Sequence, residues 1–199
     1  MMDNAIKEVL ALIGMVLGLI GLVPYVIDIF RHKTKPHSFS WLIWAILTAI
    51  GFAGQTTDHG GAGTWVTGLN CLGCISVFLL SLKYGERIIT KTDWMSFVFA
   101  LTTIPVWLVT KTPLYSMIMI SLIDALGFYP TFRKSWDKPE EETLSSWILA
   151  GLMYSFSLLS LENYSLVTTL YPLTITITNY GFCGYILWRR YVLKVNHDN

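Results

Sequence analysis

The side chains that could do chemistry in this sequence are four polar residues set inside long apolar segments: Gln55, Asn70, Asp124 and Asn179. A primary amide offers two N–H donors and an acceptor oxygen, so it can hydrogen-bond a solute or a neighbouring helix. A carboxyl can also bind and release a proton. All four are therefore candidate binding groups, and for Asn70 and Asn179 two roles stay open, lining a pocket or joining helices.

The sequence has no pattern typical of an enzyme active site or a metal centre. Paired carboxylates, Ser–His combinations and metal-ligand clusters are absent from the apolar segments. Cys71 and Cys74 have the spacing of half a zinc site, but no second pair or nearby histidine completes it. We interpret them as small residues that allow helices to pack closely. The sequence predicts no enzymatic activity, no metal and no cofactor.

The composition indicates a protein that lies in a lipid bilayer. Of 199 residues, 53% are hydrophobic and only 14% are charged, whereas soluble domains usually carry about 25% charged residues. The mean hydropathy is +0.53. The formal net charge of +1 gives no reason to expect a nucleic-acid partner. We therefore expect a multi-pass integral protein of the cell membrane.

Seven segments are long enough, or nearly long enough, to cross a bilayer as a helix, which takes about 20 apolar residues. The fourth is the shortest and contains Pro105. Backbone polar groups in lipid must be paired within the protein, so these segments should be helices. The sequence thus predicts an all-α membrane protein with seven transmembrane helices. The segments are residues 9–30, 39–55, 62–82, 94–109, 114–132, 144–161 and 167–188.

The positive charges predict the orientation of these helices. With seven spans, twelve of the fourteen Lys and Arg residues fall on one side, and only Lys7 and Lys111 fall on the other. Because cytoplasmic loops carry the excess of Lys and Arg, this side should be cytoplasmic. The N-terminus would then lie outside and the C-terminus would be cytoplasmic.

One unit occurs twice in the chain. Pro24 and Pro130 correspond, and the pairs Ser40-Trp41 and Ser146-Trp147 follow them at the same separation. This predicts two parallel three-helix repeats, residues 1–88 and 113–199, joined by a linker helix within residues 89–112 (3+1+3). Each proline is either a hinge or the site of a fixed bend.

These features resemble the SWEET sugar facilitators and the related SemiSWEET and PQ-loop membrane transporters. The marks of the resemblance are the two prolines, the two Ser-Trp pairs and one Asn in the third helix of each repeat. In that family these Asn residues line the central pocket and hydrogen-bond sugar hydroxyls, which implies this role for Asn70 and Asn179. The family's Pro-Gln signature is replaced by Pro24-Tyr25 and Pro130-Thr131. The short chain is similar to prokaryotic members.

The resemblance implies a membrane transporter that moves a small polar solute, by default a sugar, by alternating access. Two other functions stay open on the same scaffold, because a fold does not determine a function. One is a proton-coupled amino-acid carrier of the PQ-loop group. The other is a receptor or sorting protein that transports nothing. A homo-oligomer is an open alternative to a monomer.

Asp124 and Gln55 extend the list of candidate binding residues. Asp124 lies six residues before Pro130, and the first repeat has Gly18 at the matching position. An ionised carboxylate at bilayer depth costs about 2.5 kcal/mol or more. Asp124 could therefore bind solute or a proton in a cavity, contact a polar neighbour, or stay wet near the cytoplasmic boundary. Gln55 could face the cavity or its outer mouth.

Overall fold

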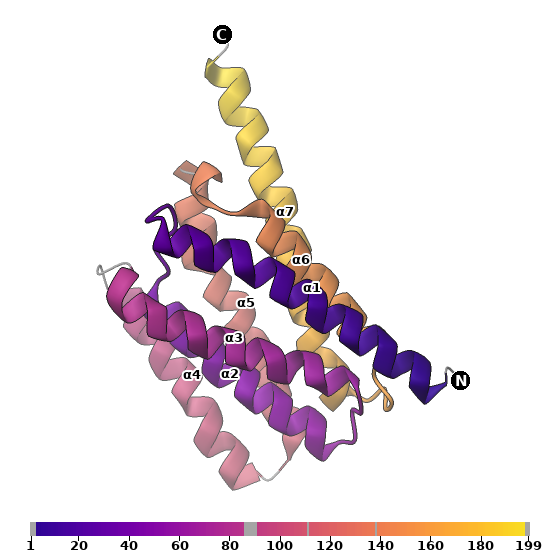
Figure 1. The fold of residues 1–199 in the computed structure, drawn as a ribbon. Coiled ribbons are helices and arrows are strands. Elements are labelled where there is room, and N and C mark those ends of the chain that lie inside the picture. Colours follow the sequence, from indigo (N-terminus) through magenta and orange to yellow (C-terminus); the bar gives the residue numbers. More distant parts are fainter. Residues whose placement is uncertain (1–2, 86–90, 111, 138, 198–199) are drawn as a thin grey trace.

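The computed structural model describes residues 3–85, 91–110, 112–137 and 139–197, except for several side chains, most of them in the fourth and fifth helices. These residues form seven α-helices and a short 3₁₀ helix, which confirms the prediction of an all-α chain (Figure 1). Each predicted segment lies largely within one helix. The helices are α1 (Asn4–Phe30), α2 (Ser38–Thr57), α3 (Gly63–Tyr84), α4 (Lys91–Thr110), α5 (Pro113–Asp137), η1 (Pro139–Glu141), α6 (Leu144–Leu159) and α7 (Leu166–His197).

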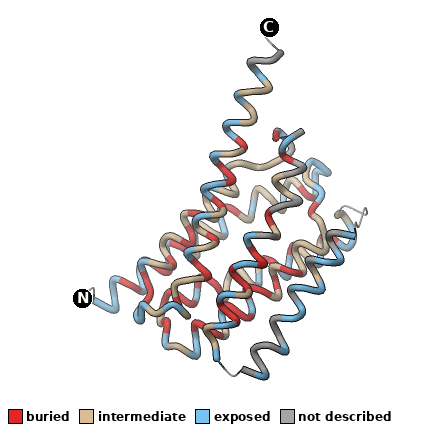
Figure 2. The backbone as a smooth tube through the Cα atoms, turned by 180° about the vertical axis from the view of Figure 1, so that it is seen from behind, coloured by how far each residue is buried: buried red, intermediate tan, exposed pale blue. Residues whose placement is uncertain are grey.

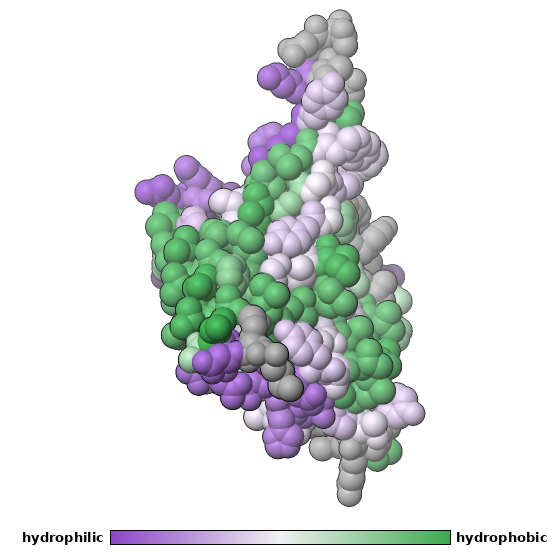
Figure 3. Space-filling model, turned by 90° about the vertical axis from the view of Figure 1, so that its right-hand side faces the viewer, coloured by the Kyte–Doolittle hydropathy of each residue, from purple (hydrophilic) through white to green (hydrophobic). Residues whose placement is uncertain are grey.

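Three of these helices, α1, α2 and α3, are long and apolar enough to cross a membrane, by length and composition, among the residues described. Residues Pro113–Ala125 of α5 and the whole of α6 are shorter apolar helices. The surface agrees with this composition, because α1 exposes Val9, Val16 and Val23. Figure 3 shows a broad hydrophobic area on one face, with hydrophilic residues gathered toward its two ends. The chain thus has the features of a multi-pass membrane protein.

The helices pack in two sets of three, with contacts between the sets. Helix α3 packs against α1 and α2, and α7 packs against α5 and α6. The sets meet where α1 packs on α6 and where α2 packs on α5, while α4 packs on α5 and α2. The last turns of α7 extend beyond the bundle toward the C-terminus (Figure 1).

The core lies where the two sets meet. A cluster of buried residues there includes Leu47 of α2, Ile120 of α5, Tyr154 of α6 and Tyr171 of α7, and buried positions concentrate in the middle of the bundle in Figure 2. A second cluster, centred on Phe128 and Phe182, is made largely of aromatic rings. Because aromatic side chains bury large areas, these clusters hold the helices at fixed separations.

Gly51 permits a close approach of α2 to α5 and α7. A Cβ atom at this position would lie 2.6 Å from Cδ1 of Tyr171 and 3.5 Å from Cδ1 of Ile120. Any side chain at position 51 would therefore force the Tyr171 ring away from α2. By contrast, a Cβ atom at Gly181 would have no neighbour within 4 Å.

We predict that Gly51→Ala destabilises the protein whereas Gly181→Ala does not. Overpacking a close contact costs about 1–3 kcal/mol, while Gly→Ala in an unhindered helix stabilises by about 0.5–1 kcal/mol. Thermal unfolding of the purified variants in detergent measures the difference. A melting temperature for Gly51→Ala equal to or above that of Gly181→Ala would show that this contact does not constrain the bundle.

Candidate functional site

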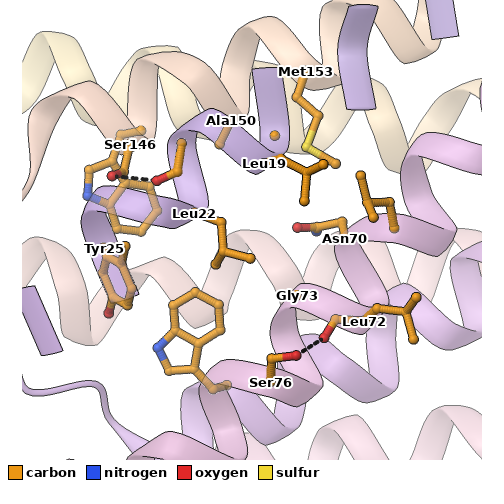
Figure 4. A pocket seen from close by; sticks show the side chains of 15 residues that line it. Leu19, Leu22, Tyr25, Asn70, Leu72, Gly73, Ser76, Ser146, Ala150 and Met153 are labelled. Atoms are coloured by element: carbon orange, nitrogen blue, oxygen red, sulfur yellow. Dashed lines mark hydrogen bonds between the residues drawn. The ribbon is translucent and has the colours of Figure 1, made fainter. Parts of the chain in front are cut away.

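A half-open pocket of about 240 Å³ lies between α1, α3 and α6, beside the start of α2 (Figure 4). It extends from the middle of the bundle toward the end that carries the α1–α2 connection. Small residues leave this space between the helices, and aromatic and aliphatic side chains form most of its wall. The lining residues include Gly18, Gly21, Leu22, Tyr25, Trp41, Asn70, Gly73, Ser146, Trp147, Ala150 and Met153.

Asn70 is the sequence-predicted site residue that lines this pocket. Its Nδ2 donates a hydrogen bond to the hydroxyl of Tyr154, at 2.9 Å. Its carbonyl oxygen Oδ1 accepts no hydrogen bond from the described residues, and the amide points toward Leu22 in Figure 4. Asn70 therefore joins α3 to α6 and also presents an acceptor to the pocket. These are the two roles that the sequence left open for it, joining helices and lining a pocket.

Three other polar groups of the pocket wall are paired within the protein. Ser146 Oγ donates to the carbonyl oxygen of Gly21 at 3.0 Å. Ser76 Oγ donates to the carbonyl oxygen of Leu72 at 2.8 Å. The indole N–H of Trp147 donates to Oε2 of Glu142 at 3.2 Å. The rest of the wall is apolar except for the Asn70 amide, the Tyr25 hydroxyl and the Trp41 indole.

Asp124 lies outside this pocket, in a buried polar region between α5, α6 and α7. It is 3% exposed, and its Oδ2 has no hydrogen-bond partner in the part of the chain that the structure describes. The hydroxyls of Ser121 and Tyr171 are also buried without partners. Tyr154 and Tyr171 are both close enough to interact with the Asp124 carboxylate electrostatically. Tyr154 thus contacts Asn70 on one side and faces this buried region on the other.

Asn179 does not occupy a place equivalent to that of Asn70. It is 3% exposed, and its Nδ2 donates to the carbonyl oxygen of Ile175 in its own helix at 2.8 Å. Its Oδ1 is buried without a partner, and Asn179 is not among the lining residues of the pocket. The structure therefore does not bring the two asparagines together in this pocket.

Gln55 joins α2 to α7 near the end of the bundle that carries the α2–α3 and α6–α7 connections. Its Nε2 donates to the carbonyl oxygen of Thr168 at 3.0 Å, and its side chain is fully buried. Ser165 Oγ donates to the Asp58 carboxylate close by. The backbone N–H of Glu162 donates to the carbonyl oxygen of Gly60 at 3.1 Å. These bonds tie the two connections together and close this end of the bundle.

The two prolines differ in what the structure describes of them. Pro24 lies within α1, which continues as one helix from Asn4 to Phe30. It follows Gly21 and Leu22, which line the pocket. The side chain of Pro130 lies outside the described residues. Both hinge assignments remain predictions.

The pocket lies against α1 and α3 because smaller residues stand there than at the matching positions of α5 and α7, which carry phenylalanines. Gly73 follows Asn70 by three positions, and Phe182 follows Asn179 by three positions. Leu22 and Phe128 correspond in the same way, two residues before the matched prolines. The rings of Phe128 and Phe182 pack 5.9 Å apart in the aromatic cluster. The matching space in the second half is therefore filled.

Sequence reasoning missed Met153 and Tyr171. Met153 lines the pocket opposite Gly18, where a Cβ atom would lie 2.4 Å from its Sδ. Tyr171 adds a hydroxyl to the buried polar region. Neither has a local signal, because a Met or Tyr in an apolar helix is usually a packing residue. The sequence signal that could have pointed to these two regions is the difference between Gly18 and Asp124, which stand at matched positions of the two repeats.

No group of three or more His, Cys, Asp or Glu side chains that could hold a metal ion occurs among the residues that the structure describes. The chain is not significantly similar to any known family model, curated protein or solved structure.

Proposed function

We propose that the chain is a membrane transporter that moves a small polar solute by alternating access. In this proposal the seven α-helices cross the bilayer as two parallel three-helix repeats and a linker, with the N-terminus outside. The sequence resemblance to SWEET and PQ-loop transporters makes a sugar the default solute. Equivalent helix packing in the two sets supports the repeats, since α1 on α6 matches α5 on α2.

The observation that carries the proposal is a group of polar atoms without partners in the middle of an apolar bundle. Asp124 Oδ2, Tyr171 Oη and Asn179 Oδ1 are buried and unpaired. A buried polar group without a hydrogen bond costs roughly 1–3 kcal/mol, and polar groups at membrane depth commonly mark a solute or ion path. Sugar hydroxyls donate and accept hydrogen bonds, so a sugar that reached these atoms could pair with them.

The difference between the two ends of the bundle supports alternating access. One end is closed by the bonds of Gln55, Ser165 and Glu162 across the two connections. The pocket beside Asn70 extends toward the other end. A carrier that works by alternating access is closed on one side while its site is reached from the other. The two prolines, Pro24 and Pro130, would let the ends of α1 and α5 move between such states.

We predict that purified protein in liposomes carries out saturable uptake of at least one member of a panel of mono- and disaccharides, and that Asn70→Ala lowers this uptake about tenfold or more. Losing one partner leaves a solute hydroxyl buried and unpaired. The family resemblance predicts the same loss for Asn179→Ala. Thr102→Ala is the matched control, because Thr102 Oγ1 bonds only its own helix, at 2.6 Å from the Phe99 carbonyl oxygen.

Uptake that is unchanged in both Asn variants would remove the two amides from the solute site. Absence of uptake for sugars, amino acids and organic acids alike would favour the receptor or sorting role on this scaffold.

A proton-coupled carrier is the second candidate function, and Asp124 favours it. Its carboxyl is buried, its Oδ2 has no hydrogen-bond partner among the described residues, and proton binding would remove a charge that is costly at bilayer depth. Such a group could carry a proton in one direction of the transport cycle. The amino-acid carriers of the PQ-loop group would then be the closer functional analogues.

We predict for this candidate that an inward pH gradient stimulates uptake by the wild type and that Asp124→Asn abolishes the stimulation while leaving the protein folded. The amide keeps the size of the carboxyl but cannot exchange a proton. Exchange of labelled solute across the membrane without a gradient serves as the control for folding. Uptake by the wild type that is independent of pH, or full stimulation of Asp124→Asn, would exclude Asp124 as the coupling group.

A further inference from the structure

The pocket beside Asn70 is poorly matched to a sugar or an ion. None of its 15 lining residues is charged. An ion moved into it would lose its water without gaining a counter-charge, which is costly. This argues against carboxylates and zwitterionic amino acids as its occupants.

Three donors of the pocket wall are used inside the protein. The hydroxyls of Ser76 and Ser146 donate to backbone carbonyls, and the indole of Trp147 donates to Glu142. The indole of Trp41 lies against the ring of Tyr25, with ring centroids 5.2 Å apart. A sugar has many hydroxyls, and most of them would be buried here without partners, at a cost for each. A good ligand for this pocket must therefore be largely apolar.

The carbonyl oxygen of Asn70 is left as an acceptor for a ligand. Asn70 Oδ1 accepts no hydrogen bond from the described residues, while Asn70 Nδ2 is held by Tyr154 at 2.9 Å. That bond fixes the amide, so Oδ1 is presented in one orientation. A ligand with a single N–H or O–H donor would complete this pairing, whereas a ligand without a donor would leave Oδ1 buried and unpaired.

The walls are suited to a flat ring. Tyr25 and Trp41 pack with ring centroids 5.2 Å apart at one end, and Trp147 also lines the pocket. Met153 supplies a thioether sulfur, which makes favourable contacts with aromatic rings. Aromatic rings prefer edge-to-face and offset packing against one another. These surfaces favour an aromatic occupant over a flexible chain.

The pocket is open between α1 and α3 on the apolar outer surface of the bundle. Leu19 and Leu72 line it and are 47% and 63% exposed. Ile75 and Leu79, on the same helix as Leu72, are also exposed. A ligand dissolved in the apolar surroundings of the helices can therefore reach the pocket without passing through either polar end.

We propose that this pocket is a binding site for a neutral aromatic compound with one N–H or O–H donor, which Asn70 Oδ1 accepts. The compound enters between α1 and α3. It is a second ligand, separate from the transported solute of the proposed function. Because it occupies Asn70, its binding would compete with any use of that amide by the solute.

The test is thermal unfolding of the purified full-length protein in detergent, titrated with indole and with benzofuran. Indole has one N–H donor, and benzofuran has nearly the same shape without it. A ligand that binds only the folded state raises the melting temperature by mass action. We expect indole to raise it at about fivefold lower concentration than benzofuran, from the loss of one hydrogen bond. Asn70→Ala should remove this preference.

Two further variants separate the pocket from the rest of the surface. Ala150→Leu fills the pocket, since Ala150 lines it, and should abolish the shift by indole. Ala125→Leu adds the same atoms at an exposed position of α5 and should leave the shift intact. This control also accounts for partition of indole into detergent.

Three results would overturn the proposal: equal shifts by indole and benzofuran in the wild type, an undiminished indole shift in Ala150→Leu, or a glucose shift that Ala150→Leu abolishes. The comparison of indole with benzofuran uses the wild type alone, so the proposal stays testable if Ala150→Leu does not fold. Failure of sugar uptake in liposomes would leave this binding site standing, and absence of indole binding would leave the transport proposal standing.

Discussion

The structure depends most on one constraint, the pairing of polar atoms inside an apolar helical bundle. A backbone or side-chain polar group away from water needs a partner within the protein. Several groups have one, as Ser146 has in Gly21 and Asn70 has in Tyr154. Among the described residues, the buried side-chain atoms without a partner include those of Asp124, Tyr171 and Asn179, and the Oε1 atom of Gln55. Any function of the bundle must involve these unpaired atoms or tolerate their cost.

A second determinant is the size of the residues at matched positions in the two halves. Glycine at positions 18 and 73 leaves a pocket in the first half. Aspartate and phenylalanine at the matched positions 124 and 182 give the second half a buried acid and a filled aromatic cluster. The bundle thus has an apolar pocket and a buried polar region, joined through the bond between Asn70 and Tyr154. This difference supports our proposal of two chemically different ligands.

The helices could be predicted from the sequence because long apolar runs determine them without help from distant residues. The place of Asp124 in an apolar segment left three placements open, and burial was one of them. The placement of Asn179 did not follow, because equal sequence position does not give equal packing when Phe182 replaces Gly73. The role of Gln55 depended on Thr168, a partner over a hundred residues away. The pocket depended on which glycines face each other across helices, which no local pattern records.

The central claim is a bundle that crosses the membrane seven times with its two repeats parallel. It is tested most directly by labelling single cysteines from either side of intact cells, after Cys71, Cys74 and Cys183 are replaced by alanine. Lys35→Cys, Lys194→Cys and His59→Cys place the label at three exposed positions. The account predicts that a membrane-impermeant maleimide labels His59→Cys in intact cells, and labels Lys35→Cys and Lys194→Cys only after permeabilisation. Labelling of Lys35→Cys and Lys194→Cys from opposite sides would contradict it.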